Sequence, residues 1–171
     1  DSLPEQLLLN LGSDTFDPQL PPWDDLDRVI MVGMGGTAIA ADLLTRLVTP
    51  VCAIPVMTWR DYGLPAWAAS QRTLVILCSH SGNTEETLSA FQAAVENDCR
   101  ILAITTGGTL AGRARALGAP LWIFSHAGQP RAAVGIVFAL LVKAFTTLGL
   151  IPPLDADILG CVNVLREQRE L

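Results

Sequence analysis

The side chains best suited to chemistry lie in one short segment with the sequence CSHSGNTEET. Ser79, Ser81 and Thr84 bring three hydroxyl groups close to Gly82. An apolar run that predicts a buried parallel strand precedes the segment, and apolar residues at helical spacing follow it. A hydroxyl-rich turn at a helix N-terminus offers hydroxyl donors, backbone N–H groups and the positive end of the helix dipole. The sequence therefore predicts an anion site, with phosphate as the anion.

Helix capping is the alternative explanation for these residues. Asn83 would be the N-cap, and Glu86 three residues later would complete a capping box. Capping needs only one or two of the polar groups, so three hydroxyls and Gly82 favour phosphate binding. His80, inside the turn, is expected to form a polar wall of the site.

Strand-like and helix-like segments alternate along the chain and must position this turn. The predicted strands are residues 28–32, 51–58, 73–78, 100–105 and 121–124, and the predicted helices are 37–48, 84–97, 109–117 and 132–148, the last being the longest. This alternation indicates an α/β fold, with a three-layer, doubly wound, five-stranded parallel sheet. Pro55 inside the second strand favours an edge position for that strand.

Beyond this region, three parts of the chain are expected. Residues 1–27 would form an N-terminal helix (3–11) and a surface connection, 28–150 the α/β domain, and 151–171 a C-terminal helix. The helix over 37–48 carries a set of apolar residues on one side: Ile39, Leu43, Leu44 and Leu47. The C-terminal helix carries Ile158, Val162 and Leu165 on one face, which predicts packing against the body or a partner.

A second polar loop, Gly33-Met34-Gly35-Gly36-Thr37, follows the first strand. A flavodoxin-like strand order, 2-1-3-4-5, would place it beside the hydroxyl-rich turn and make one site of the two. Its glycines also fit the dinucleotide fingerprint G-x-G-x-x-A, so an NAD(P)-binding oxidoreductase is an alternative. That fingerprint expects an acidic residue about 20 positions on, at the end of the second strand. The strand ends in Trp59-Arg60, with Asp61 late, so phosphosugar binding is favoured.

Composition excludes several classes of protein. The 171 residues suit one domain, and a net charge of −6 argues against a nucleic-acid binder. No uninterrupted apolar stretch reaches about 18 residues, so no membrane span is predicted. No signal peptide is recognisable, and a cytoplasmic location is expected, although a chain that starts at Asp1 could be a processed piece. The four cysteines are widely spaced, which indicates neither a disulfide framework nor a zinc site, and no metal or cofactor is expected.

The two loops resemble those of the sugar isomerase (SIS) domain. The segment Gln129-Pro130-Arg131-Ala132-Ala133 is similar to one in the bifunctional phosphoglucose/phosphomannose isomerase branch, and the resemblance covers residues 28–148. It implies that the turn of Ser79, Ser81 and Thr84 holds a sugar phosphate, and that Gly35 and Gly36 let the backbone approach the sugar. Thr37 stands where the family usually has serine. Arg131 would stabilise an enediolate during aldose–ketose isomerisation.

The chain departs from the family in one large respect. Those isomerases have two SIS subdomains, and their glutamate base and ring-opening histidine lie in the second, to which no segment here corresponds. The candidates within this chain are His80, Glu85, Glu86 and His126, and none of them is a convincing base, with His126 expected to be a solvated loop residue.

The resemblance implies a chain that binds hexose 6-phosphate, forms a homodimer, and isomerises poorly unless partner residues complete the site. A phosphosugar-sensing module without turnover is an alternative. A single-domain isomerase such as 6-phospho-3-hexuloisomerase is another, against which the Pro-Arg-Ala segment speaks.

Overall fold

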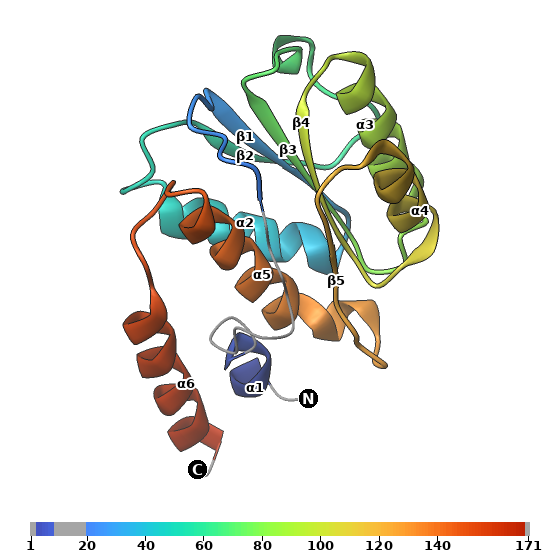
Figure 1. Ribbon diagram of the computed structural model, residues 1–171. Coiled ribbons are helices and arrows are strands. Elements are labelled where there is room, and N and C mark those ends of the chain that lie inside the picture. The colour runs from blue at the N-terminus through green and yellow to red at the C-terminus, as the bar shows by residue number, and fades with distance from the viewer. Residues whose placement is uncertain (1–2, 9–19, 170–171) are drawn as a thin grey trace.

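A five-stranded parallel sheet forms the centre of the computed structural model, which describes residues 3–8 and 20–169 (Figure 1). The strands are β1 (Arg28–Val32), β2 (Val56–Trp59), β3 (Thr73–Ser79), β4 (Arg100–Thr105) and β5 (Leu121–Ile123). Their order is β2-β1-β3-β4-β5, and every neighbouring pair is parallel. This is the predicted doubly wound order, with β2 at an edge. Because β1 lies beside β3, the loops that follow these strands are neighbours.

Helices cover both faces of the sheet and complete the three layers. On one face lie α2 (Gly36–Val48) and α5 (Val134–Thr147), preceded by the 3₁₀ turn η2 (Pro130–Ala133). On the other face lie α3 (Glu85–Glu96), α4 (Gly108–Leu117) and the 3₁₀ turn η1 (Ala66–Ala68). Two further helices, α1 (Leu3–Leu8) and α6 (Asp155–Arg169), pack side by side below α5 (Figure 1).

Successive side chains of a strand point to opposite faces of the sheet, so the core has two halves. In β3, Leu74 and Ile76 pack with the cluster under α2 and α5, whereas Val75 and Leu77 face α3 and α4. All seven residues of β3 are buried, as expected for a central strand covered on both faces. The run of apolar residues before the hydroxyl-rich turn is therefore a strand that fixes the turn rigidly.

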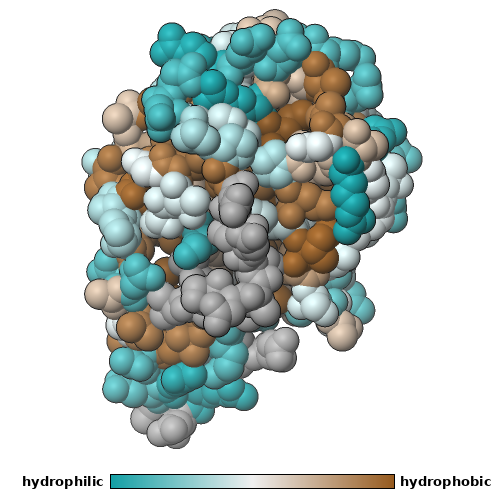
Figure 2. All heavy atoms as spheres, viewed as in Figure 1, coloured by the Kyte–Doolittle hydropathy of each residue, from teal (hydrophilic) through white to brown (hydrophobic). Residues whose placement is uncertain are grey.

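The apolar residues of α2 do not share one environment. Leu44 is fully buried, but Ile39, Leu43 and Leu47 are 51%, 51% and 46% exposed. The inward face is instead made of small residues, which allow α2 to pack closely along α5: Ala38, Ala40 and Ala41. Leu43 and Leu47 line an apolar groove of about 310 Å³ together with residues of α1 and α5. Figure 2 shows hydrophobic patches over the middle of one face of the molecule.

One segment, Pro130–Thr147, is long and apolar enough to cross a membrane by length and composition. It comprises η2 and α5, and 56% of it is buried inside the protein. Its residues Ile136, Leu140 and Phe145 belong to the core cluster beneath the sheet. Packing against the sheet therefore accounts for the apolar character of this helix.

Several predicted boundaries are wrong. Residues 51–55 form a turn rather than the start of β2, because the N–H groups of Val51 and Cys52 bond back to the carbonyl of Val48. Pro55, which cannot donate a ladder hydrogen bond, immediately precedes the strand. The last helix of the α/β unit begins as the 3₁₀ turn η2, and α6, with 15 residues against 14, is longer than α5.

A helix lies near each end of the described chain. The N-terminal helix covers Leu3–Leu8, and residues 9–11 of the predicted helix and 12–19 of the predicted connection lie outside the described residues. In α6, Ile158 and Val162 are buried, and Leu165 packs against the same core cluster. The apolar face of this helix is thus covered by the body of the protein.

Candidate functional site

The hydroxyl-rich turn joins β3 to α3 and is held by its own side chains. Ser79, the last residue of β3, is buried, and its Oγ lies 2.9 Å from Thr84 Oγ1. The same oxygen accepts a 3.0 Å hydrogen bond from the N–H of Gly82. Ser81 is exposed, and its Oγ accepts the N–H of Asn83 at 3.2 Å. Ser79 and Thr84 therefore shape the turn from within, while Ser81 faces outward.

The first turn of α3 has no side-chain cap. The N-cap is Thr84, not the predicted Asn83, and its hydroxyl is not bonded to the helix because it is engaged with Ser79. The capping box of Asn83 and Glu86 is therefore not formed. Backbone N–H groups in a first helical turn have no partner within the helix, and the dipole makes this end positive. The start of α3 thus offers donors to an anion.

A second loop, between β4 and α4, is interlocked with this turn. Gly82 has a φ of +67°, and a Cβ there would lie 1.9 Å from the carbonyl oxygen of Gly107. The Asn83 side chain accepts hydrogen bonds from the N–H of Thr109 (3.0 Å) and its hydroxyl (2.8 Å). The carbonyl of His80 accepts the Thr106 hydroxyl at 2.6 Å. These contacts fix the backbone of the turn, so its donors are pre-organised.

The glycine loop lies between β1 and α2. Gly35 is the N-cap of α2 at a φ of +53°, a conformation that favours glycine. The hydroxyl of Thr37 closes the loop, because it donates to the carbonyl of Met34 at 2.9 Å and accepts the N–H of Met34 at 3.1 Å. Thr37 is buried, so its oxygen is occupied within the loop.

The structure brings Arg131 to this glycine loop. A Cβ on Gly36 would lie 3.1 Å from the Cα of Arg131 and 3.1 Å from the carbonyl oxygen of Pro130. Gly36 is therefore the point at which the predicted Pro-Arg-Ala segment, now η2, packs onto the start of α2. Arg131 itself is exposed and makes no ion pair with the described residues.

One contributor to this arrangement was not predicted from the sequence. Gln6 of α1 is only 3% exposed, and its Nε2 donates to the carbonyl of Ala132 at 2.7 Å. Its Oε1 accepts the N–H of Ile136 at 3.2 Å. The side chain thus bridges the junction between η2 and α5, directly behind Arg131. The sequence offered little signal for this contact, because Gln6 follows another polar residue, Glu5, in the same short helix.

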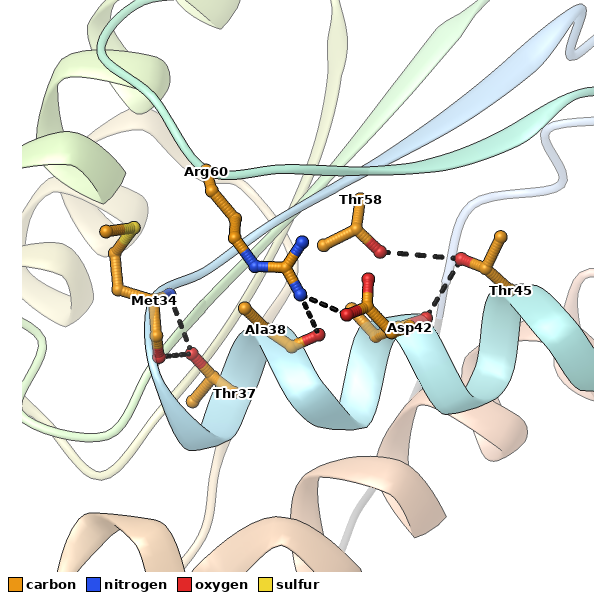
Figure 3. A network of polar contacts seen from close by, with 8 residues as sticks. Met34, Thr37, Ala38, Asp42, Thr45, Thr58 and Arg60 are labelled. Atoms are coloured by element: carbon orange, nitrogen blue, oxygen red, sulfur yellow. Dashed lines mark hydrogen bonds and ion pairs between the residues drawn. The ribbon is translucent and has the colours of Figure 1, made fainter.

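At the end of β2, Arg60 occupies the place where a dinucleotide site would have an acid. Its guanidinium bonds to the carboxylate of Asp42 and to the carbonyl of Ala38, so it ties α2 to β2 beside the glycine loop (Figure 3). The Arg60 guanidinium contributes to holding the pKa of Asp42 below its usual value, although partial burial opposes this. Asp61 lies in the following loop, and its carboxylate accepts the N–H of Tyr62 at 2.7 Å. No ribose-binding carboxylate stands at the strand end.

The two histidines of the chain meet at the same edge of the sheet. His80 Nε2 and His126 Nδ1 are 3.2 Å apart, and the ring of His80 lies edge-on against Phe124 with centroids 5.8 Å apart. Burial, and secondarily the charge on His126, lowers the pKa of His80. His80, predicted to form a polar wall, and His126, predicted to be a solvated loop residue, thus form one hydrogen-bonded pair.

The carboxylates nearest the turn are at the start of α3. Glu85 is exposed and accepts a 3.1 Å hydrogen bond from the hydroxyl of Tyr62, and Glu86 is half-buried. Side chains of α3 and α4 line a separate, shallow hollow on the outer side of these helices. Among the described residues, no three histidine, cysteine or carboxylate side chains are grouped to hold a metal ion.

The chain is similar in sequence and in fold to known proteins. No family model matches the chain. It is 48% identical over 147 residues to the bifunctional phosphoglucose/phosphomannose isomerase of Caldicellulosiruptor bescii, an alignment covering 86% of this chain and 43% of that protein. It is 34% identical over 141 residues to the protein of the same name from Thermoplasma volcanium, covering 82% and 42%. The chain therefore spans less than half the length of these relatives.

Solved structures agree on the fold. The tagatose-6-phosphate ketose/aldose isomerase of Escherichia coli matches with a TM-score of 0.63 at 18% identity, over 96% of this chain and 51% of that one. The sugar isomerase domain of the RpiR transcription factor from Sphaerobacter thermophilus matches with a TM-score of 0.55 at 20% identity, over 98% and 93%. The chain has the fold of sugar isomerase (SIS) domains, and its sequence is similar to part of the bifunctional phosphoglucose/phosphomannose isomerases. The predicted resemblance is confirmed.

Proposed function

We propose that this SIS domain binds hexose 6-phosphates, as the first SIS half of an isomerase that interconverts glucose 6-phosphate or mannose 6-phosphate with fructose 6-phosphate. One observation carries the proposal. Helix α3 begins without a side-chain cap, at a rigid turn in which three hydroxyl-bearing residues surround Gly82. Such a helix N-terminus is a ready-made phosphate site. The similarity to phosphoglucose/phosphomannose isomerases supports the choice of a sugar phosphate.

In this proposal the residues of the turn have two different roles. Ser81 and the N–H groups of the first turn of α3 donate to the phosphate, and so does Thr84, whose hydroxyl accepts from Ser79 and keeps its own proton for the ligand. Ser79, Gly82 and Asn83 keep the turn in shape. His80 borders the phosphate on the side of β5.

The glycine loop and η2 contact the sugar part of the ligand. Gly35, with open space at its Cβ position, lets the sugar approach the backbone, while Gly36 makes room for η2 and Thr37 holds the loop closed. The fixed positive charge of Arg131 stabilises the enediolate, whose negative charge develops during proton transfer between C1 and C2.

A phosphosugar-sensing module without turnover is the second candidate, and one observation favours it. The carboxylate beside the site, Glu85, is exposed, and one of its oxygens is occupied by the hydroxyl of Tyr62. An aldose–ketose isomerase needs a base positioned at the substrate carbon. In the first proposal another segment or a second subunit supplies that base, and the proposal includes a homodimer located in the cytoplasm.

The melting temperature of the chain, measured with glucose 6-phosphate, fructose 6-phosphate, NAD and NADP separately, tests the proposal. A ligand at about 100 times its Kd adds about 2.7 kcal/mol to the free energy of unfolding, which corresponds to a rise of several degrees. We expect the rise with the hexose phosphates alone, and its loss in the double variant Ser81→Ala/Thr84→Ala. Stabilisation by NAD or NADP alone would mean that the glycine loop is a dinucleotide site.

A further inference from the structure

We propose that His80 and His126 form a proton-accepting part of the phosphate site, which is neutral when the site is empty and takes up a proton when a phosphate dianion binds. The inference rests on the proposed function and deepens it. It assigns a charge to a site whose other donors in the turn, hydroxyls and backbone N–H groups, are neutral.

The geometry allows one proton between the two rings. His80 Nε2 and His126 Nδ1 lie 3.2 Å apart with the rings at 89°, so one nitrogen donates and the other accepts. The other nitrogen of each ring carries the remaining proton or lone pair. One further proton adds to the outer nitrogen of the donating ring, so the bond between the rings is kept and becomes charge-assisted. Protonation therefore converts a neutral pair into a hydrogen-bonded cationic one.

The position of His80 places this charge at the anion. His80 lies between Ser79 and Ser81 in the turn, and its carbonyl is held by the N–H (3.3 Å) and the hydroxyl (2.6 Å) of Thr106. The buried ring of Phe124 limits its other side. The imidazole is thus confined to the neighbourhood of the turn in either protonation state.

The charges around the pair do not supply a competing partner. The surrounding elements contribute Glu85 and Glu86 from α3 and Arg131 from η2, and the loops after β1 and β4 carry no charged side chain between their strands and helices. No carboxylate of residues 3–8 or 20–169 is hydrogen-bonded to either imidazole. Burial, and then the repulsion from a charged His126, lower the pKa of His80, so the empty site favours neutral His80. A dianion acts in the opposite direction and raises the pKa.

Nuclear magnetic resonance tests this on the unmodified chain. The sequence has only two histidines, so two imidazole C2–H resonances report the pair, and His126→Gln assigns them. Both are titrated from pH 5 to 8, without ligand and with saturating glucose 6-phosphate. We expect the ligand to raise the pKa of at least one imidazole by about one unit, the lower end of the effect of an opposite charge within about 4–6 Å.

The outcomes separate this inference from the proposed function. If backbone amide resonances of the turn shift with glucose 6-phosphate but both imidazole pKa values stay unchanged, the proton-accepting pair is refuted and the binding site stands. If no amide responds to the ligand, both proposals fall. Because a phosphate ester itself titrates near pH 6, affinity alone would not isolate the pair. Proton uptake by calorimetry in two buffers, larger in the wild type than in His80→Gln, is the second supporting measurement.

Discussion

His80 is a basic side chain that ionises less readily in the folded chain than in the unfolded chain. Burial, and then His126, lowers its pKa in the folded state, whereas an unfolded imidazole titrates near 6.5. Below pH about 6.5 the unfolded chain therefore binds more protons than the folded chain, and the free energy of unfolding rises with pH in this range. The stability that depends on neutral His80 is present above about pH 6.5 and is lost as the pH falls.

We therefore expect the urea midpoint to decline from pH 7 to pH 5.5, before most carboxylates titrate. In His80→Gln this decline should be smaller, because the variant has no proton to exclude at that position. Equal declines in the two proteins would show that His80 does not govern this pH range. Glutamine keeps a side-chain donor and acceptor near His126, which makes the comparison conservative.

At the scale of the element, the turn after β3 and the loop after β4 depend on each other through their glycines. Gly82→Ala would place a Cβ 1.9 Å from the Gly107 carbonyl oxygen, at a φ of +67°. We expect a loss of about 2–5 kcal/mol in the free energy of unfolding, from left-handed strain and overpacking together. Chemical denaturation of the variant measures it.

Gly112→Ala is the matched control for this variant. Gly112 lies inside α4 and has open space around it, so alanine should gain up to about 1 kcal/mol from helix propensity. A Gly82→Ala protein as stable as the Gly112→Ala protein would contradict the close approach of the two loops.

The helix α1 acts on the site at a distance, through Gln6. Gln6→Ala removes two hydrogen bonds at the junction of η2 and α5, and it leaves the carbonyl of Ala132 and the N–H of Ile136 without this partner. We expect a loss of about 1–3 kcal/mol in stability and weaker hexose phosphate binding, because Arg131 adjoins this junction.

Gln92→Ala provides the comparison for Gln6→Ala. Gln92 is an exposed glutamine of α3 that bonds only to Glu96 within the described residues, so its replacement should change stability by no more than about 0.5 kcal/mol. Similar unfolding curves for the two variants would show that the Gln6 bridge contributes nothing.

At the scale of the whole molecule, local pattern predicted the sheet well and the long-range contacts poorly. The bounds of β1 and β4 follow from short β-branched runs, and the strand order follows from the need to bring two polar loops together. The outward face of α2 was not evident, because apolar spacing marks a side of a helix but not what covers it. Gln6 and the pair of His80 with His126 join residues 126 and 46 positions apart, which no local pattern encodes.

Binding and turnover should separate in this chain. The turn and the glycine loop lie within the described residues and are pre-organised, so we expect hexose phosphate binding to need no further part. Isomerisation needs a base at the substrate carbon, and the nearest carboxylate, Glu85, is exposed and bound by Tyr62. We expect calorimetry to show binding of glucose 6-phosphate, while a coupled assay for fructose 6-phosphate shows no turnover at the usual enzymatic rates of about 1–1,000 per second.

Turnover at such rates, abolished by His80→Gln, His126→Gln or Glu85→Gln, would instead identify a base within the chain. Turnover unaffected by these changes would mean that a second subunit supplies it, which a dependence of the rate on protein concentration would reveal.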